Sequence, residues 1–306
     1  GEFPCFHVIT EKAHPKFIHL YLSQEPIWNE IVRISSGQTN VSRLRLKVQA
    51  FLAMEIPLPP LAEQRRIVSR IEALAARVTE AQGLRREASE EAELLLAAQL
   101  KKIRHKLLES NYPKKKIGDI AQVTSGGTPS RDNPTYWGGD IPWIKTGELV
   151  DGDILNAEEH ITQEGMKNSS AKLFPPETIL VALYGQGQTR GRTARLMIEA
   201  TTNQACCVIL PTPEILESRF TQYWQRSLYY EMREKSHGGA QPNWNGSMIK
   251  NIEIALPPLE EQRRLVAYLD GLQAQVSKLR AVQEETAREL NALMPSVLDR
   301  AFKGEM

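Results

Sequence analysis

One stretch of this chain occurs twice, and the repeat limits what the rest can fold into. Residues 56–68 read Ile-Pro-Leu-Pro-Pro-Leu-Ala-Glu-Gln-Arg-Arg-Ile-Val, and residues 254–266 read Ile-Ala-Leu-Pro-Pro-Leu-Glu-Glu-Gln-Arg-Arg-Leu-Val, an offset of 198 (254 minus 56). Proline cannot continue an earlier helix, but the first turn of a new helix tolerates it because the N–H groups there have no partner. Each copy therefore predicts a helix that starts at its second leucine, Leu61 or Leu259.

The two predicted helices are long and carry an apolar stripe. Apolar residues follow each copy at alternating spacings of three and four, which is heptad spacing: Ile71, Leu74, Val78 and Ala81 in the first, and Leu269, Leu272, Val276 and Leu279 in the second. The first helix is expected to reach about Glu109, and the second about Val297, weakened at Pro295. Two separate solvated helices would leave a long apolar seam in water, so we expect them to pair antiparallel.

Composition sets the outer limits on the class of protein. With 306 residues, 41 % of them hydrophobic and 25 % charged, the chain is large enough for more than one core. The sequence has no membrane-spanning run and no signal peptide, which indicates a cytoplasmic location. Cys5, Cys206 and Cys207 form neither a disulfide framework nor a zinc pattern. The net charge of +1 does not by itself indicate a nucleic-acid binder, so local clusters must carry any such prediction.

A second, weaker repeat predicts the domain organisation. Phe17, Gln38 and Asn40 match Phe220, Gln241 and Asn243 at an offset of 203 (220 minus 17). We therefore interpret residues 1–55 as the last part of a domain whose complete copy spans 111–253, with helices at 56–110 and 254–306. The counterpart of residues 111 to about 203 is then missing from the first copy. The expectation is a truncated or proteolysed sample, or a piece supplied by another molecule; Gly1-Glu2-Phe3 is compatible with a cloning scar.

Residues 111–253 carry the candidate binding loops. Residues 179–183 and 205–210 are apolar runs that predict buried strands, and between them lies a polar loop at 184–195. Its glutamines suit adenine, its arginines suit guanine or phosphate, and its glycines allow close backbone approach. Clusters at 125–131 and 237–245 have the same makeup, although each is also typical of a simple turn.

A run of basic residues follows the first predicted helix: Lys101, Lys102, Arg104, Lys106, Lys114, Lys115 and Lys116. Two interpretations stay open. The cations can complement the negative end of the helix dipole, or they can contact phosphates and bring affinity without sequence information.

Two patterns typical of enzymes do not fit. Five residues rather than four separate Gly185 from Gly191, and Arg192 stands where a phosphate-binding loop has lysine. Residues 133–136, Asn-Pro-Thr-Tyr, lack the second proline of the box with which adenine methyltransferases hold a flipped base. The histidines show no metal spacing and no nucleophile has a recognisable setting, so we do not expect catalysis in this chain.

Several motifs together resemble one known family. They are the repeated Leu-Pro-Pro-Leu-x-Glu-Gln-Arg-Arg, the Gly-Gly-x-Gln-Pro-Asn of residues 238–243, the Ser-Gly-Gly-Thr-Pro-Ser of 125–130, the Tyr-Trp-Gly-Gly-Asp-Ile-Pro-Trp of 136–143 and the Thr-Asn-Gln-Ala of 202–205. Over essentially the whole chain, they resemble the specificity subunit of type I restriction-modification systems. The resemblance implies an α+β fold in which two target-recognition domains, each reading half of a bipartite site, are joined by two antiparallel helices.

The resemblance also implies partners. These are double-stranded DNA, methyltransferase subunits that bind the helical spacer, and a translocating endonuclease subunit. S-adenosylmethionine, magnesium and ATP would belong to those partners and not to this chain. The chain departs from the family pattern at its first recognition domain, whose front has no counterpart here, and this leaves residues 111–253 as the complete reader.

We predict that DNA contacts come from the loops and the basic run. The predicted residues are Thr128, Ser130, Arg131, Lys145, Tyr184, Gln186, Gln188, Arg190, Arg192, Gln241, Asn243, Lys114, Lys115 and Lys116. Of these, the glutamines and arginines of the 184–195 loop are expected at base edges and the lysines at phosphates. The alternative function is a coiled-coil scaffold whose globular domain binds protein, and the salt dependence of DNA binding distinguishes the two.

Overall fold

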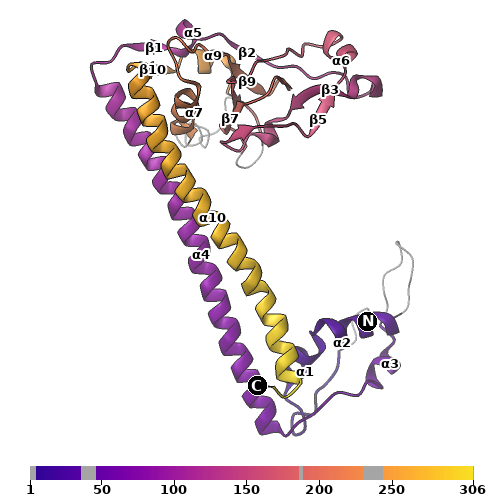
Figure 1. Cartoon of the computed structure of the whole chain (residues 1–306). Coiled ribbons are helices and arrows are strands. Elements are labelled where there is room, and N and C mark those ends of the chain that lie inside the picture. The colour runs from indigo at the N-terminus through magenta and orange to yellow at the C-terminus, as the bar shows by residue number, and fades with distance from the viewer. Residues whose placement is uncertain (1–4, 36–45, 186–188, 230–243, 306) are drawn as a thin grey trace. The chain divides into compact units, whose positions relative to one another are not determined.

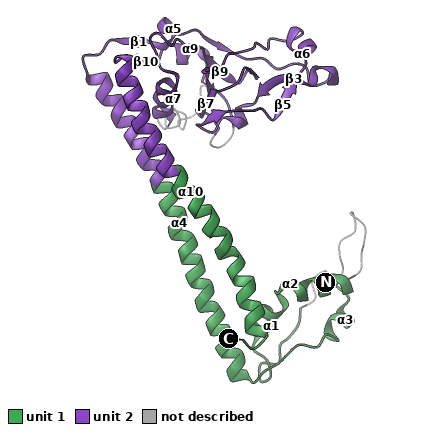
Figure 2. Cartoon of the chain, in the orientation of Figure 1, with its two compact units in different colours: residues 1–91, 277–306 green, residues 92–276 purple. Residues whose placement is uncertain are grey.

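The computed structural model describes residues 5–35, 46–185, 189–229 and 244–305 (Figure 1). The chain divides into two compact units, residues 1–91 with 277–306 (unit 1) and residues 92–276 (unit 2), as Figure 2 shows. The division crosses both long helices, so each unit contains one part of each.

In the described residues of unit 1 the regular elements are helices: α1 (Pro15–Leu22), α2 (Glu25–Ile34), α3 (Val48–Leu52), the first part of α4 (Leu61–Glu109) and the last part of α10 (Leu259–Phe302). Helix α4 begins at Leu61 and ends at Glu109, as the proline pair and the heptad pattern predict. Buried side chains join α1 to both long helices, with Phe17 against Ile71 of α4 and Ala301 of α10 in one apolar cluster. The ring of Phe17 also lies 5.0 Å from that of Phe302.

Helix α10 continues through Pro295 to Phe302, beyond the predicted end near Val297. Proline removes one N–H donor and crowds the carbonyl four residues earlier, which weakens a helix locally. The surrounding turns are held by apolar contacts in unit 1: Met294, Val297, Leu298, Ala301 and Phe302. Tertiary packing therefore outweighs the local effect of the proline.

Unit 2 adds a mixed α/β body to the other parts of α4 and α10. Its helices are α5 (Ile117–Ile120), α6 (Gln163–Lys167), α7 (Ser218–Ser227) and α9 (Gly246–Lys250), with short 3-10 turns at Pro134–Tyr136 and Thr146–Glu148. Its strands are β1 (Lys114–Lys116), β2 (Val123–Ser125), β3 (Trp137–Ile144), β4 (Asp153–Ile154), β5 (Glu159–Ile161), β6 (Ile179–Ala182), β7 (Thr193–Leu196), β8 (Thr201–Thr202), β9 (Cys206–Ile209) and β10 (Glu253–Ala255). The described strands form sheets in the orders β2-β9-β6-β7-β4, β5-β3-β8 and β1-β10.

The central strands β6 and β9 are buried along their whole length, as continuous apolar runs predict. Alternate residues point to opposite faces of the sheet. Ile179 and Val181 face one cluster, which contains Phe220 and Trp224 of α7, whereas Leu180 faces a second. The five-stranded main sheet of unit 2 is therefore covered on both faces, and α7 covers one of them.

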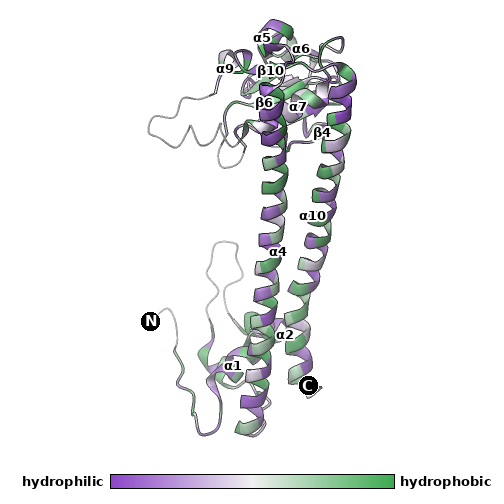
Figure 3. Cartoon of the chain, turned by 90° about the vertical axis from the view of Figure 1, so that its left-hand side faces the viewer, coloured by the Kyte–Doolittle hydropathy of each residue, from purple (hydrophilic) through white to green (hydrophobic). Residues whose placement is uncertain are grey.

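Within each unit α4 and α10 pack antiparallel, as the repeat predicts. In unit 2, Leu96 and Leu100 of α4 share a cluster with Leu269 of α10. In unit 1, the amide of Gln82 donates to that of Asn291 at 2.9 Å. Figure 3 shows apolar residues recurring along both helices between polar ones. None of the helices in the described part of the chain has the length and apolar character that crossing a bilayer requires.

The thiols of strand β9 give a test of this buried core. Burial raises the pKa of Cys206 and of Cys207 to about 12. Because the thiolate is the reactive form, we expect neither to react with an aromatic disulfide reagent at about pH 8 until the protein is unfolded. The raised pKa also means that stability falls as the pH rises above about 8.5, where the unfolded chain ionises first. The measurement is thiol labelling of a Cys5→Ser variant; rapid labelling of the native protein would contradict the buried β9.

Candidate nucleic-acid interface

The strand pairing of unit 2 brings three loops to one edge of its main sheet. Strands β2 and β6 both pair antiparallel with β9, so both end at the edge where β9 begins. The segments that follow β2 and β6 and the segment that precedes β9 must therefore meet there. We call this the loop edge: residues 126–131, 183–185, 189–192 and 203–205.

Hydrogen bonds tie the loop edge together. The backbone N–H of Gly127 donates to the carbonyl of Thr202 at 2.8 Å, and that of Leu183 donates to Ala205 at 2.9 Å. The hydroxyl of Thr128 donates to the side-chain oxygen of Gln204. The bonds of Gly127 and Thr128 join the 125–131 cluster to the Thr-Asn-Gln-Ala motif of residues 202–205, and the bond of Leu183 joins the segment after β6 to the same motif.

Glycines at the loop edge serve close packing. A Cβ on Gly126 would lie 1.9 Å from the carbonyl oxygen of Thr202, and one on Gly127 would lie 2.3 Å from the carbonyl carbon of Ser170. Gly191 has φ of 85°, a conformation that other residues rarely adopt. The small residues that suggested close approach to a ligand therefore also have a structural reason to be small.

Two tryptophans of β3 pack against the first segment of the loop edge, residues 126–131. Their rings, Trp137 and Trp143, meet edge to face at 5.0 Å between centroids. The indole N–H of Trp143 donates to Gly127 O at 2.9 Å, and that of Trp137 donates to Ser130 O at 3.0 Å. The guanidinium carbon of Arg131 lies 3.6 Å from the centroid of the Trp137 ring. The two tryptophan side chains thus hold the loop that carries Ser130 and Arg131 in place.

A carboxylate pair neutralises two of the predicted cations. Strand β5 pairs with β3 and sets Glu159 opposite Trp143. Glu159 binds Arg131 at 2.5 Å and Lys145 at 2.9 Å, and Lys145 also binds Glu158 at 3.0 Å. The hydrogen bond from Arg131, followed by that from Lys145, lowers the pKa of Glu159, and Glu159 in turn raises the pKa of Lys145. The side chains of Arg131 and Lys145 remain 53 % and 35 % exposed, so solvent-borne phosphate can reach both.

Arg192 is held inside unit 2. Its guanidinium binds the Asp151 carboxylate at 2.7 Å, and Asp151 also accepts the backbone N–H of Thr193 at 2.9 Å. Burial lowers the pKa of Arg192, but the charge of Asp151 outweighs it and the net pKa is raised. Its predicted contact with a base stays a prediction, and that contact would have to compete with this ion pair.

The structure places the three lysines of β1 apart from the loop edge. Strand β1 pairs with β10, and the N–H of Ile117 donates to Ile252 O at 2.9 Å. The N–H of Leu210 donates to Gln122 O at 3.0 Å, which sets the start of β2 beside the end of β9. Residues 114–116 therefore lie beyond the start of β2, whereas the loop edge lies at its end. All three lysines are exposed.

The remaining predicted residues divide into two groups. Tyr184, which is 39 % exposed, and Arg190 lie on the loop edge. Gln186, Gln188, Gln241 and Asn243 lie outside the described residues. The sequence analysis did not predict Gln204, Glu158 or Glu159 as residues of the site. Of these, only Gln204 could have been found from the sequence, because it belongs to the Thr-Asn-Gln-Ala motif of residues 202–205.

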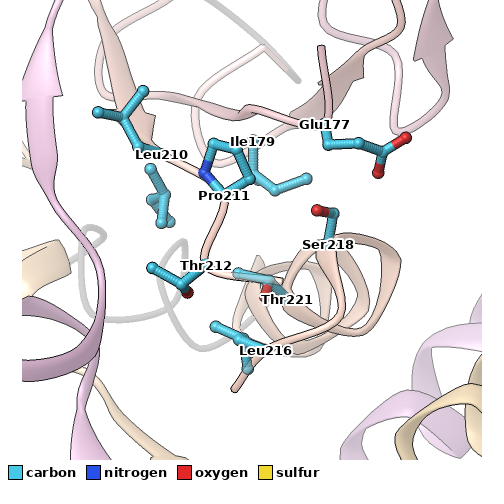
Figure 4. Close-up of a pocket in the computed structure, with 9 residues that line it drawn as sticks. Glu177, Ile179, Leu210, Pro211, Thr212, Leu216, Ser218 and Thr221 are labelled. Carbon is cyan, nitrogen blue, oxygen red and sulfur yellow. The ribbon is translucent and has the colours of Figure 1, made fainter. Parts of the chain in front are cut away.

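A pocket beside α7 does not offer a small-molecule site. It is lined by Glu177, Ile179, Ile209, Leu210, Pro211, Thr212, Leu216, Ser218 and Thr221 (Figure 4). Its enclosed space is about that of a single water, which is far below the few hundred Å³ of a nucleotide site. Among the described residues no cluster of His, Cys, Asp and Glu has the makeup of a metal site.

Comparisons with known proteins point in one direction. A family model described as "Type I restriction modification DNA specificity domain" matches residues 2–87 and 109–286. The specificity subunit of the type I restriction enzyme MjaIX of Methanocaldococcus jannaschii is 32 % identical over 190 residues, which are 60 % of this chain and 43 % of that relative. The StySPI specificity subunit of Salmonella potsdam is 23 % identical over 95 % of this chain and 65 % of its own length. The chain thus spans less than two thirds of these curated relatives.

Solved structures agree with this fold. One, described as "Structural basis underlying complex assembly and conformational transition of the type I R-M system", matches with a TM-score of 0.77 and 29 % identity, over 97 % of this chain and 73 % of that chain. The HsdS subunit of Thermoanaerobacter tengcongensis matches with a TM-score of 0.58 and 28 % identity, over 97 % and 72 %. The α+β architecture with two long helices is therefore shared with these proteins.

The close packing of Gly126 against the backbone of Thr202 can be tested by comparing it with a glycine that has no neighbouring atoms in the way. We expect Gly126→Ala to lower the free energy of unfolding by about 1–3 kcal/mol, because its methyl group must displace the backbone of Thr202. Gly147→Ala is the control, since a Cβ there meets nothing within 4 Å. Urea unfolding followed by tryptophan fluorescence measures both. Equal stability of the two variants would contradict the packing of the loop edge.

Proposed function

This chain belongs to the type I restriction modification DNA specificity family, and on that premise we propose that unit 2 reads DNA sequence with its loop edge. The supporting observation is the convergence of three polar loops at one edge of a buried sheet, with Arg131 and Lys145 beside them. The relatives named above do not favour the alternative of a protein-binding scaffold.

Side chains at the loop edge suit both parts of DNA recognition. Thr128, Gln204 and Tyr184 provide the hydroxyl and amide groups that base edges need, and each good pair of hydrogen bonds is worth about 1–3 kcal/mol of discrimination. Arg131 and Lys145 provide the phosphate contacts that set position. The tryptophans beneath the first loop keep these groups in place before DNA arrives, which lowers the entropic cost of binding.

We further propose that DNA phosphates replace carboxylates at this edge. Glu158 and Glu159 hold the two cations in the free protein. A phosphate oxygen makes the same charge-assisted hydrogen bonds. Only the difference in free energy between the phosphate and the carboxylate ion pairs then contributes to affinity. Phosphate contact alone therefore gives weak binding, and contacts with the bases determine which sequence is bound.

Catalysis is proposed to reside in partner subunits. In this reading the chain is a non-catalytic specificity subunit in the cytoplasm. Methyltransferase subunits and a translocating endonuclease subunit would assemble on it and bring S-adenosylmethionine, magnesium and ATP. The supporting observation is that the curated relatives are named specificity subunits, and that one matching structure is described as part of a complex assembly.

In each unit, the exposed part of the repeat marks a docking surface for a methyltransferase subunit. Arg65 and Arg263 occupy the same place in the two copies, and both are exposed. Within the described contacts neither forms an ion pair or a side-chain hydrogen bond, unlike the adjacent Arg66, which binds Glu63 at 2.7 Å. Among the described residues no contact explains why arginine recurs at this place, and an acidic surface on a partner would.

The proposed reading of DNA is tested by selecting bound duplexes from a random-sequence pool at low salt. We expect enrichment of a short motif. Thr128→Ala should relax the preference at one position, whereas Lys145→Ala should keep the motif, weaken binding to all sequences and reduce the salt slope by about one. Lys278→Ala, on an exposed position of α10, is the control. Binding without any enrichment would contradict sequence reading by this chain.

The docking surface is tested by charge reversal. Arg65→Glu and Arg263→Glu should each weaken binding of the methyltransferase subunit by about tenfold, since each removes a rim charge and adds a repulsive one. The thermal stability of the chain alone should not change, because both side chains are exposed. Arg288→Glu, an exposed position of α10 outside the repeat, is the matched control, and titration calorimetry measures all three. Unchanged binding by both variants would refute the assignment.

A further inference from the structure

The glutamine of the repeated motif is buried in both units. Gln64 and Gln262 are each 0 % exposed, although they stand one residue before exposed arginines. The oxygen of Gln64 accepts the backbone N–H of His14 at 2.7 Å, and its amide nitrogen donates to Lys12 O at 3.1 Å and Pro59 O at 2.7 Å. Both amide hydrogens and the oxygen therefore have partners.

Gln262 repeats this geometry in unit 2. Its oxygen accepts the backbone N–H of Glu217 at 2.9 Å, and its nitrogen donates to Ile215 O at 3.0 Å and Pro257 O at 2.9 Å. The glutamines and the prolines are related by 198 residues (262 minus 64), and the other partners by 203 (217 minus 14). In each unit, the contacts of the glutamine therefore join residues of the repeat at an offset of 198 to residues of the repeat at an offset of 203.

All six bonds go to backbone groups at the start of a helix. His14 is the N-cap of α1 and Glu217 is the N-cap of α7. The side chains of these partners differ between the units, so the contact does not depend on them. It depends on a side chain that accepts one bond and donates two, which is the capacity of glutamine and not that of glutamate.

In unit 2 this contact joins the reading domain to the helix pair. Helix α7 covers one face of the main sheet through Phe220 and Trp224. Its Arg219 binds Asp153 at 2.7 Å and Asp270 of α10 at 3.1 Å. Gln262 fixes the N-cap residue of α7 to the first turn of α10, so this contact sets the direction of α7 and, through α7, the position of the loop edge.

We infer that Gln262 is a positioning residue for DNA reading, which rests on the proposed function, and that Gln64 is its counterpart for unit 1. Each acts through the start of the helix that it holds, and neither contacts DNA. The repeated motif therefore contains two features of different purpose: a buried glutamine that fixes a helix within its own unit, and an exposed arginine that faces outward.

The test replaces the glutamine by its acid. In Gln262→Glu, burial and the carbonyl oxygens of Ile215 and Pro257 disfavour the ionised carboxylate, so its folded pKa lies above the unfolded value of about 4.3. The variant should be closest to wild type at acidic pH, where the carboxyl is protonated and can donate one bond. It should lose stability as the pH rises through the raised pKa.

Binding of the selected duplex is compared with that of wild type at each pH. At about pH 8, Gln262→Glu should bind at least about tenfold more weakly, and the deficit should shrink to about threefold or less near pH 5.5. Gln64→Glu is the matched control: it should show the same pH-dependent loss of stability while binding the duplex as wild type does. If Gln262→Glu does not fold at pH 8, Gln262→Met removes the bonds without adding charge.

Amide hydrogen exchange separates this inference from the proposed function. In Gln262→Met, which removes the acceptor oxygen, the N–H of Glu217 should exchange at least about tenfold faster, with that of His14 unchanged; in Gln64→Met the pattern should reverse. If wild type does not bind DNA, the proposed function fails, and exchange still decides whether the glutamines hold the helices. Wild-type affinity of Gln262→Glu at pH 8, or an equal loss in both variants, would overturn the positioning role.

Discussion

The rest of the fold depends on how this chain buries the start of a helix. The N–H groups at a helix N-terminus have no partner within the helix, and a buried one without a partner costs about 1–3 kcal/mol. Helices α1 and α7 both begin against a long helix, and in each the backbone N–H of the N-cap residue donates to the side-chain oxygen of a glutamine. With that contact made, α7 can lie flat on the sheet, and the apolar contacts of Phe220 and Trp224 follow.

Charged groups form a second link around α7, and on the proposed function they bear on how a nearly neutral chain can present cations to DNA. The chain has 38 basic and 37 acidic residues, and many pair inside unit 2. Burial alone would raise the pKa of Asp153, but the hydrogen bond from Arg195 and the charge of Arg219 outweigh it, and the net pKa is lowered. These pairs are partly exposed, so each adds little net stability, but together they link α7 to β4 and α10. On the proposed function, the net charge of the whole chain is therefore a poor guide to what it binds.

Local patterns predicted the elements of this fold better than their arrangement. The proline pair and heptad spacing gave both long helices, and continuous apolar runs gave β6 and β9, because these signals are short-range. The meeting of the 126–131 loop with Gln204 depends on the pairing of β2 and β6 with β9, which no local pattern encodes. The same pairing separates residues 114–116 from the loop edge, although they stand only a few residues before β2. The extension of α10 from Val297 to Phe302 likewise follows from contacts distant in sequence.

The carboxylates at the loop edge bear on how a reader of sequence avoids binding all DNA equally. Phosphate contacts provide most of the affinity in non-specific complexes. In the free protein Arg131 rests on Trp137 and binds Glu159, while Lys145 is shared between Glu158 and Glu159. A phosphate that displaces these carboxylates gains only the difference between two similar ion pairs, and it leaves Glu159 without its partners near a polyanion. On the proposed function, this cost is the same for every sequence, so only a duplex that also satisfies the polar groups of the loops recovers it.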